Sequence, residues 1–181
     1  MGDRQAPEPL LLVQELANTL DIETGTDHLA TPEDLDRFVD DHELTRFRLG
    51  KRDLAGLREL REALRAACLA HAGIPVPPEA AEGLERHVGA APLTVRIETR
   101  GEAVLRPAPG LTGLTGLTAH LAARIATAAN DGTWQRLKAC VTHDCQWVYY
   151  DRSPAGRSRW CTMSVCGSRA KMRTYRARRA R

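Results

Sequence analysis

The stretch that decides how the chain is organised is its last quarter, Cys140–Arg181, which reads CVTHDCQWVYYDRSPAGRSRWCTMSVCGSRAKMRTYRARRAR. Four of the five cysteines lie here as two matching pairs, Cys140-x4-Cys145 and Cys161-x4-Cys166, with fifteen residues between the pairs. Four thiolates in two short loops can close a tetrahedral shell around a metal ion, and Zn²⁺ is the usual occupant. The spacing therefore predicts one structural zinc ion per chain.

Other uses of the four cysteines stay open at this point: two disulfides, an iron site or free thiols. The x4 spacing is at the wide end of the zinc-ligand range. Disulfides need an oxidising compartment, whereas the chain starts with the polar run Met1–Gln5 and shows no apolar signal core. His143, inside the first loop, could replace one cysteine. We expect a cytoplasmic protein with no membrane-spanning segment, since no apolar run is long enough.

The segment between the cysteine pairs has the composition of a β-hairpin. An aromatic, β-prone run at 146–150 is followed by the turn residues 153–156, and 158–160 would be the returning strand. From Ser168 onward the chain lacks Gly and Pro and is rich in Ala, Arg and Lys, which predicts a helix with Met172 and Tyr175 packed on the cysteine loops.

Charge is divided unevenly along the chain. Residues 130–181 hold twelve Lys/Arg and three Asp, a net charge of +9, and residues 1–129 carry −6. Such a basic segment favours contact with phosphates. The candidate cations for nucleic-acid contact are Arg157, Arg159, Arg169, Lys171, Arg173, Arg176, Arg178 and Arg179. A solvated helix, or one that binds an acidic protein, is the alternative interpretation.

Residues 137–178 resemble the CGNR zinc finger, a bacterial four-cysteine module. The shared motifs are Asp144-Cys145, Asp151-Arg152-Ser153, Arg159-Trp160-Cys161 and Cys166-Gly167-Ser168-Arg169, in which Ser168 stands where the family has Asn. The resemblance implies a structural zinc ion and DNA binding.

The rest of the chain predicts a mostly helical domain over 10–130, after a disordered segment 1–9 and before the finger at 134–181. We expect helices near 10–20, from Thr31 as N-cap, over 51–71 and 79–88, and from Leu114 to Asn130. The segments 93–97 and 103–105 predict one β-hairpin, whose apolar face should lie on helices. The fold class is therefore α+β.

Three motifs in this first domain resemble the ABATE domain that commonly precedes a CGNR finger: 16–21, 31–35 and 57–65. The resemblance implies a stress-responsive transcription regulator, with a first domain that senses an effector or forms a homodimer. Asn18, Thr19 and Arg61 are candidates for a small-molecule pocket. Alternatively, Asn18-Thr19 ends a helix and Arg61 pairs with Glu59 or Glu62.

No Gly-rich phosphate loop, nucleophile elbow or metalloprotease motif occurs, so the sequence predicts no enzyme and no catalytic residue. The leading hypothesis is a DNA-binding regulator. The alternatives are a protein-interaction adaptor, or an RNA-binding protein that stacks bases on Trp147, Tyr149 or Tyr150.

Overall fold

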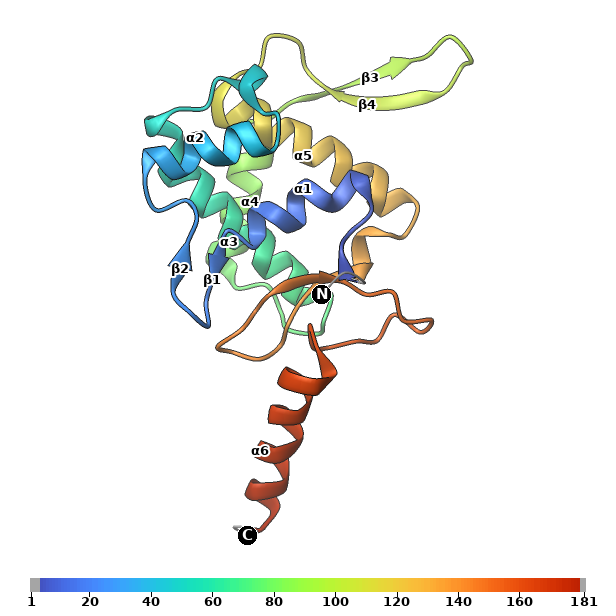
Figure 1. Cartoon of the computed structure of the whole chain (residues 1–181). Coiled ribbons are helices and arrows are strands. Elements are labelled where there is room, and N and C mark those ends of the chain that lie inside the picture. Colours follow the sequence, from blue (N-terminus) through green and yellow to red (C-terminus); the bar gives the residue numbers. More distant parts are fainter. Residues whose placement is uncertain (1–3, 180–181) are drawn as a thin grey trace.

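The computed structural model describes residues 4–179 and combines helices with small antiparallel hairpins, which confirms the α+β class (Figure 1). The helices are α1 (Glu8–Ala17), α2 (Pro32–Asp41), α3 (Leu54–Ala70), α4 (Pro78–Gly89), α5 (Gly113–Asn130) and α6 (Ser168–Arg179). The strands pair as β1 (Leu20–Asp21) with β2 (Thr26–Asp27), β3 (Leu93–Ile97) with β4 (Ala103–Pro107), and β5 (Leu137–Ala139) with β6 (Val148–Tyr150). Within the described residues, no helix is long and apolar enough to cross a membrane.

The start of α2 follows from its local sequence, as predicted. The Thr31 side chain accepts a hydrogen bond from the Asp34 amide, and the Asp34 carboxylate accepts one from the Thr31 amide. Pro32 occupies the first turn, where its missing N–H costs no hydrogen bond. This capping box satisfies amides that the helix cannot pair internally.

The apolar stripes of α1, α3 and α5 meet in one core. Fully buried leucines from the three helices include Leu16, Leu57 and Leu117. The same core continues into the last part of the chain, because Leu137 of β5 and Val148 of β6 are also fully buried in it. The first strands of the cysteine-rich segment thus pack on the helical domain.

The predicted disorder of residues 1–9 is wrong for residues 4–9; residues 1–3 lie outside the described residues. Ala6 is buried, and its amide donates a 2.6 Å hydrogen bond to the Gln14 side chain. Arg4 donates to the Trp160 carbonyl oxygen at 3.1 Å, and α1 begins at Glu8. Contacts with residues far along the chain order this segment, and these contacts leave no local signal in the sequence.

Two hairpins differ from expectation. The β3–β4 hairpin forms with the expected strands, but it projects from the body (Figure 1) and its apolar side chains Val95 and Ile97 are 67% and 65% exposed instead of covered by helices. In the cysteine-rich segment, β6 does not pair with residues 158–160. It pairs with β5, which precedes the first cysteine, in the register Ala139↔Val148.

Candidate metal centre and nucleic-acid interface

The fold brings the four predicted zinc ligands to one point. Cys140 directly follows β5 and Cys145 lies in the loop before β6, whereas Cys161 precedes a single π-helical turn, Met163–Gly167, that contains Cys166. All four sulfur atoms lie within 4.8 Å of one another. The loops are set by backbone hydrogen bonds from Cys140 to Trp147 and from Cys145 to Thr142.

The sulfur geometry suits zinc and excludes disulfides in this arrangement. The Sγ–Sγ distances are 3.6 Å for Cys145–Cys161 and 3.7 Å for Cys161–Cys166, far above the roughly 2.05 Å of a disulfide. Zn–S bonds of about 2.3 Å in a tetrahedron place sulfurs about 3.8 Å apart. The residues therefore fit one structural zinc ion. His143 is no ligand, because its side chain is 98% exposed.

The pKa shifts of Cys140 and Cys145 also fit a site for a cation. Hydrogen bonds from the Cys145 and Cys161 thiols lower the pKa of Cys140, and the same contact with Cys140 raises the pKa of Cys145. Without a cation the sulfurs thus share protons, since several thiolates this close repel one another. A dication at their centre favours the thiolate form of all four.

A buried ion pair beside the metal centre holds the loop between the cysteine pairs. Asp151 is fully buried, and Lys138 Nζ lies 3.0 Å from its Oδ2. Burial by itself would raise the pKa of Asp151, but hydrogen bonds from Ser153, Lys138 and Ser158 outweigh it and hold that pKa well below its usual range. Lys138 also donates to the Gly156 carbonyl oxygen. The sequence analysis did not predict this network. Its local contact in the sequence is the hydrogen bond from the Ser153 amide to the Asp151 carboxylate, two residues away.

The predicted cations lie on the outside of the molecule. Every one of the eight is exposed, two on the loop before Cys161 and six on α6. In Figure 1, α6 extends away from the body. The Arg169 guanidinium, at its first turn, pairs with Glu23 of the β1–β2 turn at 2.7 Å. Met172 and Tyr175 are 50% and 53% exposed, so the prediction that they pack on the cysteine loops is wrong.

The aromatic residues offered for RNA stacking are mostly internal. Tyr149 is 1% exposed and its hydroxyl donates to the Ser158 carbonyl oxygen at 2.9 Å. Tyr150 is 7% exposed and belongs to the core shared with the helices. Trp147 is half-buried. The three rings do not form a stacking platform, which removes the main support for RNA binding.

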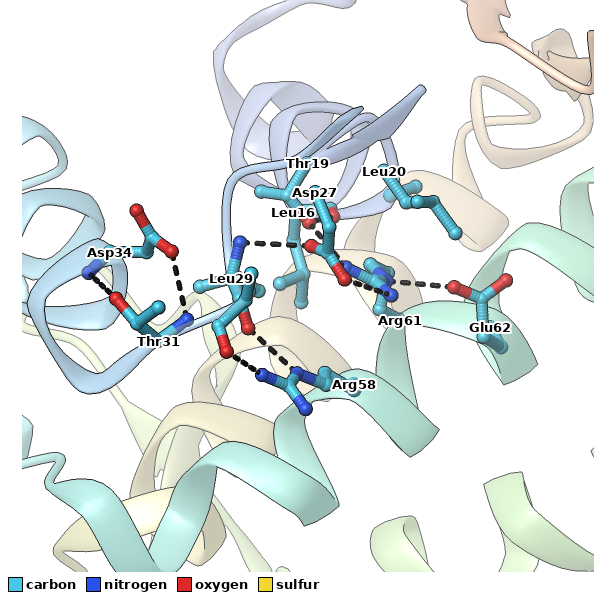
Figure 2. A network of polar contacts seen from close by, with 12 residues as sticks. Leu16, Thr19, Leu20, Asp27, Leu29, Thr31, Asp34, Arg58, Arg61 and Glu62 are labelled. Carbon is cyan, nitrogen blue, oxygen red and sulfur yellow. Dashed lines mark hydrogen bonds and ion pairs between the residues drawn. The ribbon is translucent and has the colours of Figure 1, made fainter. Parts of the chain in front are cut away.

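Two of the three pocket candidates, Thr19 and Arg61, lie in one polar network (Figure 2). Arg61 is 4% exposed and makes a bidentate contact with Asp27, with Nη1–Oδ1 and Nη2–Oδ2 distances of 2.6 and 3.2 Å. It also pairs with Glu62 at 2.7 Å and donates to the Thr19 hydroxyl at 3.3 Å. Arg61 therefore ties α3 to the β1–β2 hairpin; the Asp27 partner was not anticipated.

Asn18 fastens the cysteine-rich segment to the helical domain. Its side-chain amide donates to the Val148 carbonyl oxygen and accepts from the Val148 amide, both at 2.8 Å. Arg65 of α3, 2% exposed, donates to the carbonyl oxygens of Ala17 at 2.6 Å and of Gln146 at 3.2 Å. Sequence reasoning missed Arg65 as a link, although its place four residues after Arg61 on a mostly apolar face was a signal.

Comparison with known families divides the chain into two parts. Residues 11–132 match the model of the ABATE domain, described as a putative stress-induced transcription regulator. Residues 136–179 match the CGNR zinc finger. No curated protein matches the chain.

Proposed function

The chain belongs to the ABATE family and ends in a CGNR zinc finger, and from this premise we propose that it is a bacterial, cytoplasmic transcription regulator that binds DNA and is not an enzyme. The observation that carries the proposal is the placement of charge. Six cations and no acid lie on α6, which extends from the body, while the domain behind it is acidic.

The physical argument rests on the size and charge of α6. A single α-helix fits the major groove of B-DNA, and arginine there can contact phosphates or guanine edges. The structural zinc ion would hold the second cysteine loop, from which α6 starts, against the first, so the position of the first turn of α6 is set before binding. A four-thiolate shell leaves no open position for a catalytic water, which supports a structural and not a hydrolytic metal.

The test is fluorescence anisotropy with a labelled duplex of mixed sequence at two salt concentrations, on zinc-loaded protein. We expect affinity to fall steeply with salt. Arg173→Glu/Arg176→Glu should weaken binding at least tenfold and lower the salt slope by about two, because two fewer phosphates are neutralised. The matched control is Arg96→Glu/Arg100→Glu, two exposed cations on the β3–β4 hairpin far from α6 (Figure 1). Binding that ignores salt and the α6 variant would refute the proposal.

A protein-interaction adaptor is the second candidate. The ion pair between Arg169 and Glu23 favours it, because it places a carboxylate of this chain on the first turn of α6. Retention of an acidic protein by α6, together with no affinity for duplex DNA, would support this function instead. Since one α6 would contact only a few base pairs, we also propose that two chains act together on DNA; light scattering of the DNA-bound protein measures this.

A further inference from the structure

An open groove lies between one side of the helical domain and the cysteine loops. We call it the interdomain groove; its volume is about 1180 Å³, and it is lined by α1, the β1–β2 hairpin and α2 on one side and by both cysteine loops on the other. Asn18 and Thr19 line it, whereas Arg61 does not. A concavity of this size can enclose a drug-sized organic molecule.

The walls of the interdomain groove are apolar and partly aromatic. The helical domain contributes Leu11 and Phe38, and the cysteine-rich segment contributes Trp147, Met163 and Val165. Met163 and Val165 are 49% and 43% exposed, so their aliphatic surface meets water when the groove holds no ligand. An apolar ligand would remove this surface from water, which is favourable.

The charged groups that line the interdomain groove are mainly acidic, with five carboxylates and two guanidiniums. The acids all come from the helical domain. Part of this charge is neutralised within the protein: Asp34 pairs with Arg37, and Glu23 pairs with Arg169. The carboxylates of Glu15, Asp21 and Asp41 then remain against the single guanidinium of Arg4, so the lining of the groove keeps a net negative charge.

One end of the groove combines this charge with aromatic rings. The Glu15 carboxylate lies 3.3 Å from Nδ1 of His42, and the His42 ring lies 4.3 Å from the Phe38 ring between centroids. The Glu15 carboxylate attracts an organic cation by direct charge. Phe38 is only 6% exposed, so its ring adds a small apolar surface at this end. The same surroundings repel phosphates and carboxylates.

From these observations we propose that the interdomain groove binds an organic cation whose uncharged part is apolar and contains one or more aromatic rings. The cationic centre would lie near Glu15 and Asp41, and the apolar body would lie between Phe38 and the Met163–Val165 wall. Because Met163 and Val165 belong to the turn from which α6 starts, a ligand here touches the element that directs α6. Any effect of this ligand on DNA binding rests on the proposed function. Binding of the ligand to the groove does not rest on it.

The test uses two probes of the same shape and opposite charge, tetraphenylphosphonium and tetraphenylborate, titrated calorimetrically into the zinc-loaded full chain without DNA. We expect one phosphonium ion to bind per chain and the borate to bind at least tenfold more weakly. Equal affinity for the two ions, or no binding of the phosphonium, would overturn the proposal. Since DNA is absent, this failure is separate from any failure of DNA binding.

A pair of double variants locates the site. Glu15→Gln/Asp41→Asn removes two carboxylates from the groove and should weaken phosphonium binding at least fivefold. Asp36→Asn/Asp40→Asn removes the same charge from exposed positions of α2 outside the groove, and should leave the affinity within twofold. If both variants weaken binding equally, the cation is held by the net charge of the domain and the assigned site is wrong.

Discussion

At the scale of single residues, the Asn18 side chain replaces a neighbouring strand as the hydrogen-bond partner of β6. Its side-chain amide makes the two hydrogen bonds with Val148 that a neighbouring strand would make with the outer edge of β6. Gln14, one helical turn earlier, donates to the same carbonyl oxygen at 3.1 Å. The end of α1 therefore covers a strand edge that would otherwise leave buried polar groups unpaired.

We expect Asn18→Ala to lower the free energy of unfolding by about 1–3 kcal/mol, because it leaves the part-buried Val148 amide without its partner. The Val148 amide should also exchange faster with deuterium. Urea denaturation and NMR-detected exchange measure the two effects. Asn130→Ala, at the exposed end of α5, is the matched control. Unchanged exchange at Val148 would show that Asn18 does not hold β6.

His120 makes stability depend on pH. Burial lowers its pKa to about 4, and Arg124 and Arg46 act in the same direction; its neutral Nε2 accepts a 2.9 Å hydrogen bond from Arg124. An unfolded histidine takes up a proton near pH 6.5. Between about pH 6.5 and 4 the unfolded state thus binds more protons, so stability is lost as the pH falls through this window.

We expect His120→Gln to reduce the loss of unfolding free energy between pH 7 and pH 5 by about 1–2 kcal/mol, a value discounted because the ring is only partly buried. Urea denaturation at the two pH values measures it. Asn130→Ala, which removes no titratable group from the same helix, is the matched control. An unaltered pH dependence in His120→Gln would mean that the ring titrates normally in the folded protein.

At the scale of elements, what could be predicted is what depends on neighbours in sequence. The capping box at Thr31 and the apolar stripe of α3 are local patterns, and both helices formed where expected. The partner of β6 could not be read in this way, because residues 158–160 and β5 are both close enough along the chain to pair with it. Packing of Leu137 into the helical core selects β5.

The surroundings of the β3–β4 hairpin and of the candidate pocket also depend on residues distant in sequence, so they could not be predicted either. Alternation predicted the strands of the hairpin, but whether helices cover Val95 and Ile97 depends on elements far away in sequence. The spacing predicted the four zinc ligands, because the two cysteines of each pair lie within one short loop of the sequence. The roles of Asn18 and Arg61 depended on Val148 and Asp27, which no spacing rule connects to them.

The helix α6 should be only marginally stable without a partner. It has twelve residues, a length at which an isolated helix is marginal in water, and its like charges repel one another. We expect amides 171–179 to exchange within seconds in the free protein and to become protected when duplex DNA is added. Mass-spectrometric deuterium exchange measures this, with α2 as the internal control. Protection of α6 equal to that of α3 in the free protein would contradict it.

At the scale of the whole molecule, the cysteine-rich segment has two parts that differ in what holds them. Up to Ser158 it is fastened to the helical domain by buried β5 and β6 and by the contacts of Asn18, and the Lys138–Asp151 network holds its own loop in place. From Cys161 onward the second cysteine loop exposes Met163 and Val165. The four-cysteine site and the exposed Arg169–Glu23 ion pair link this part to the rest. Because an exposed ion pair contributes little, zinc should support the two parts unequally.

Removal of the metal therefore should not unfold the entire segment 134–181. In Cys166→Ser, or after chelation of zinc, we expect residues 161–179 to lose protection from deuterium exchange while β5, β6 and α3 keep theirs. Far-UV circular dichroism should then fall only by the contribution of α6. Cys68→Ser is the control, since Cys68 is fully buried in α3 away from the metal ligands. If β5 and β6 lose protection together with α6, zinc stabilises the shared core as well, and the chain folds as one unit around its metal.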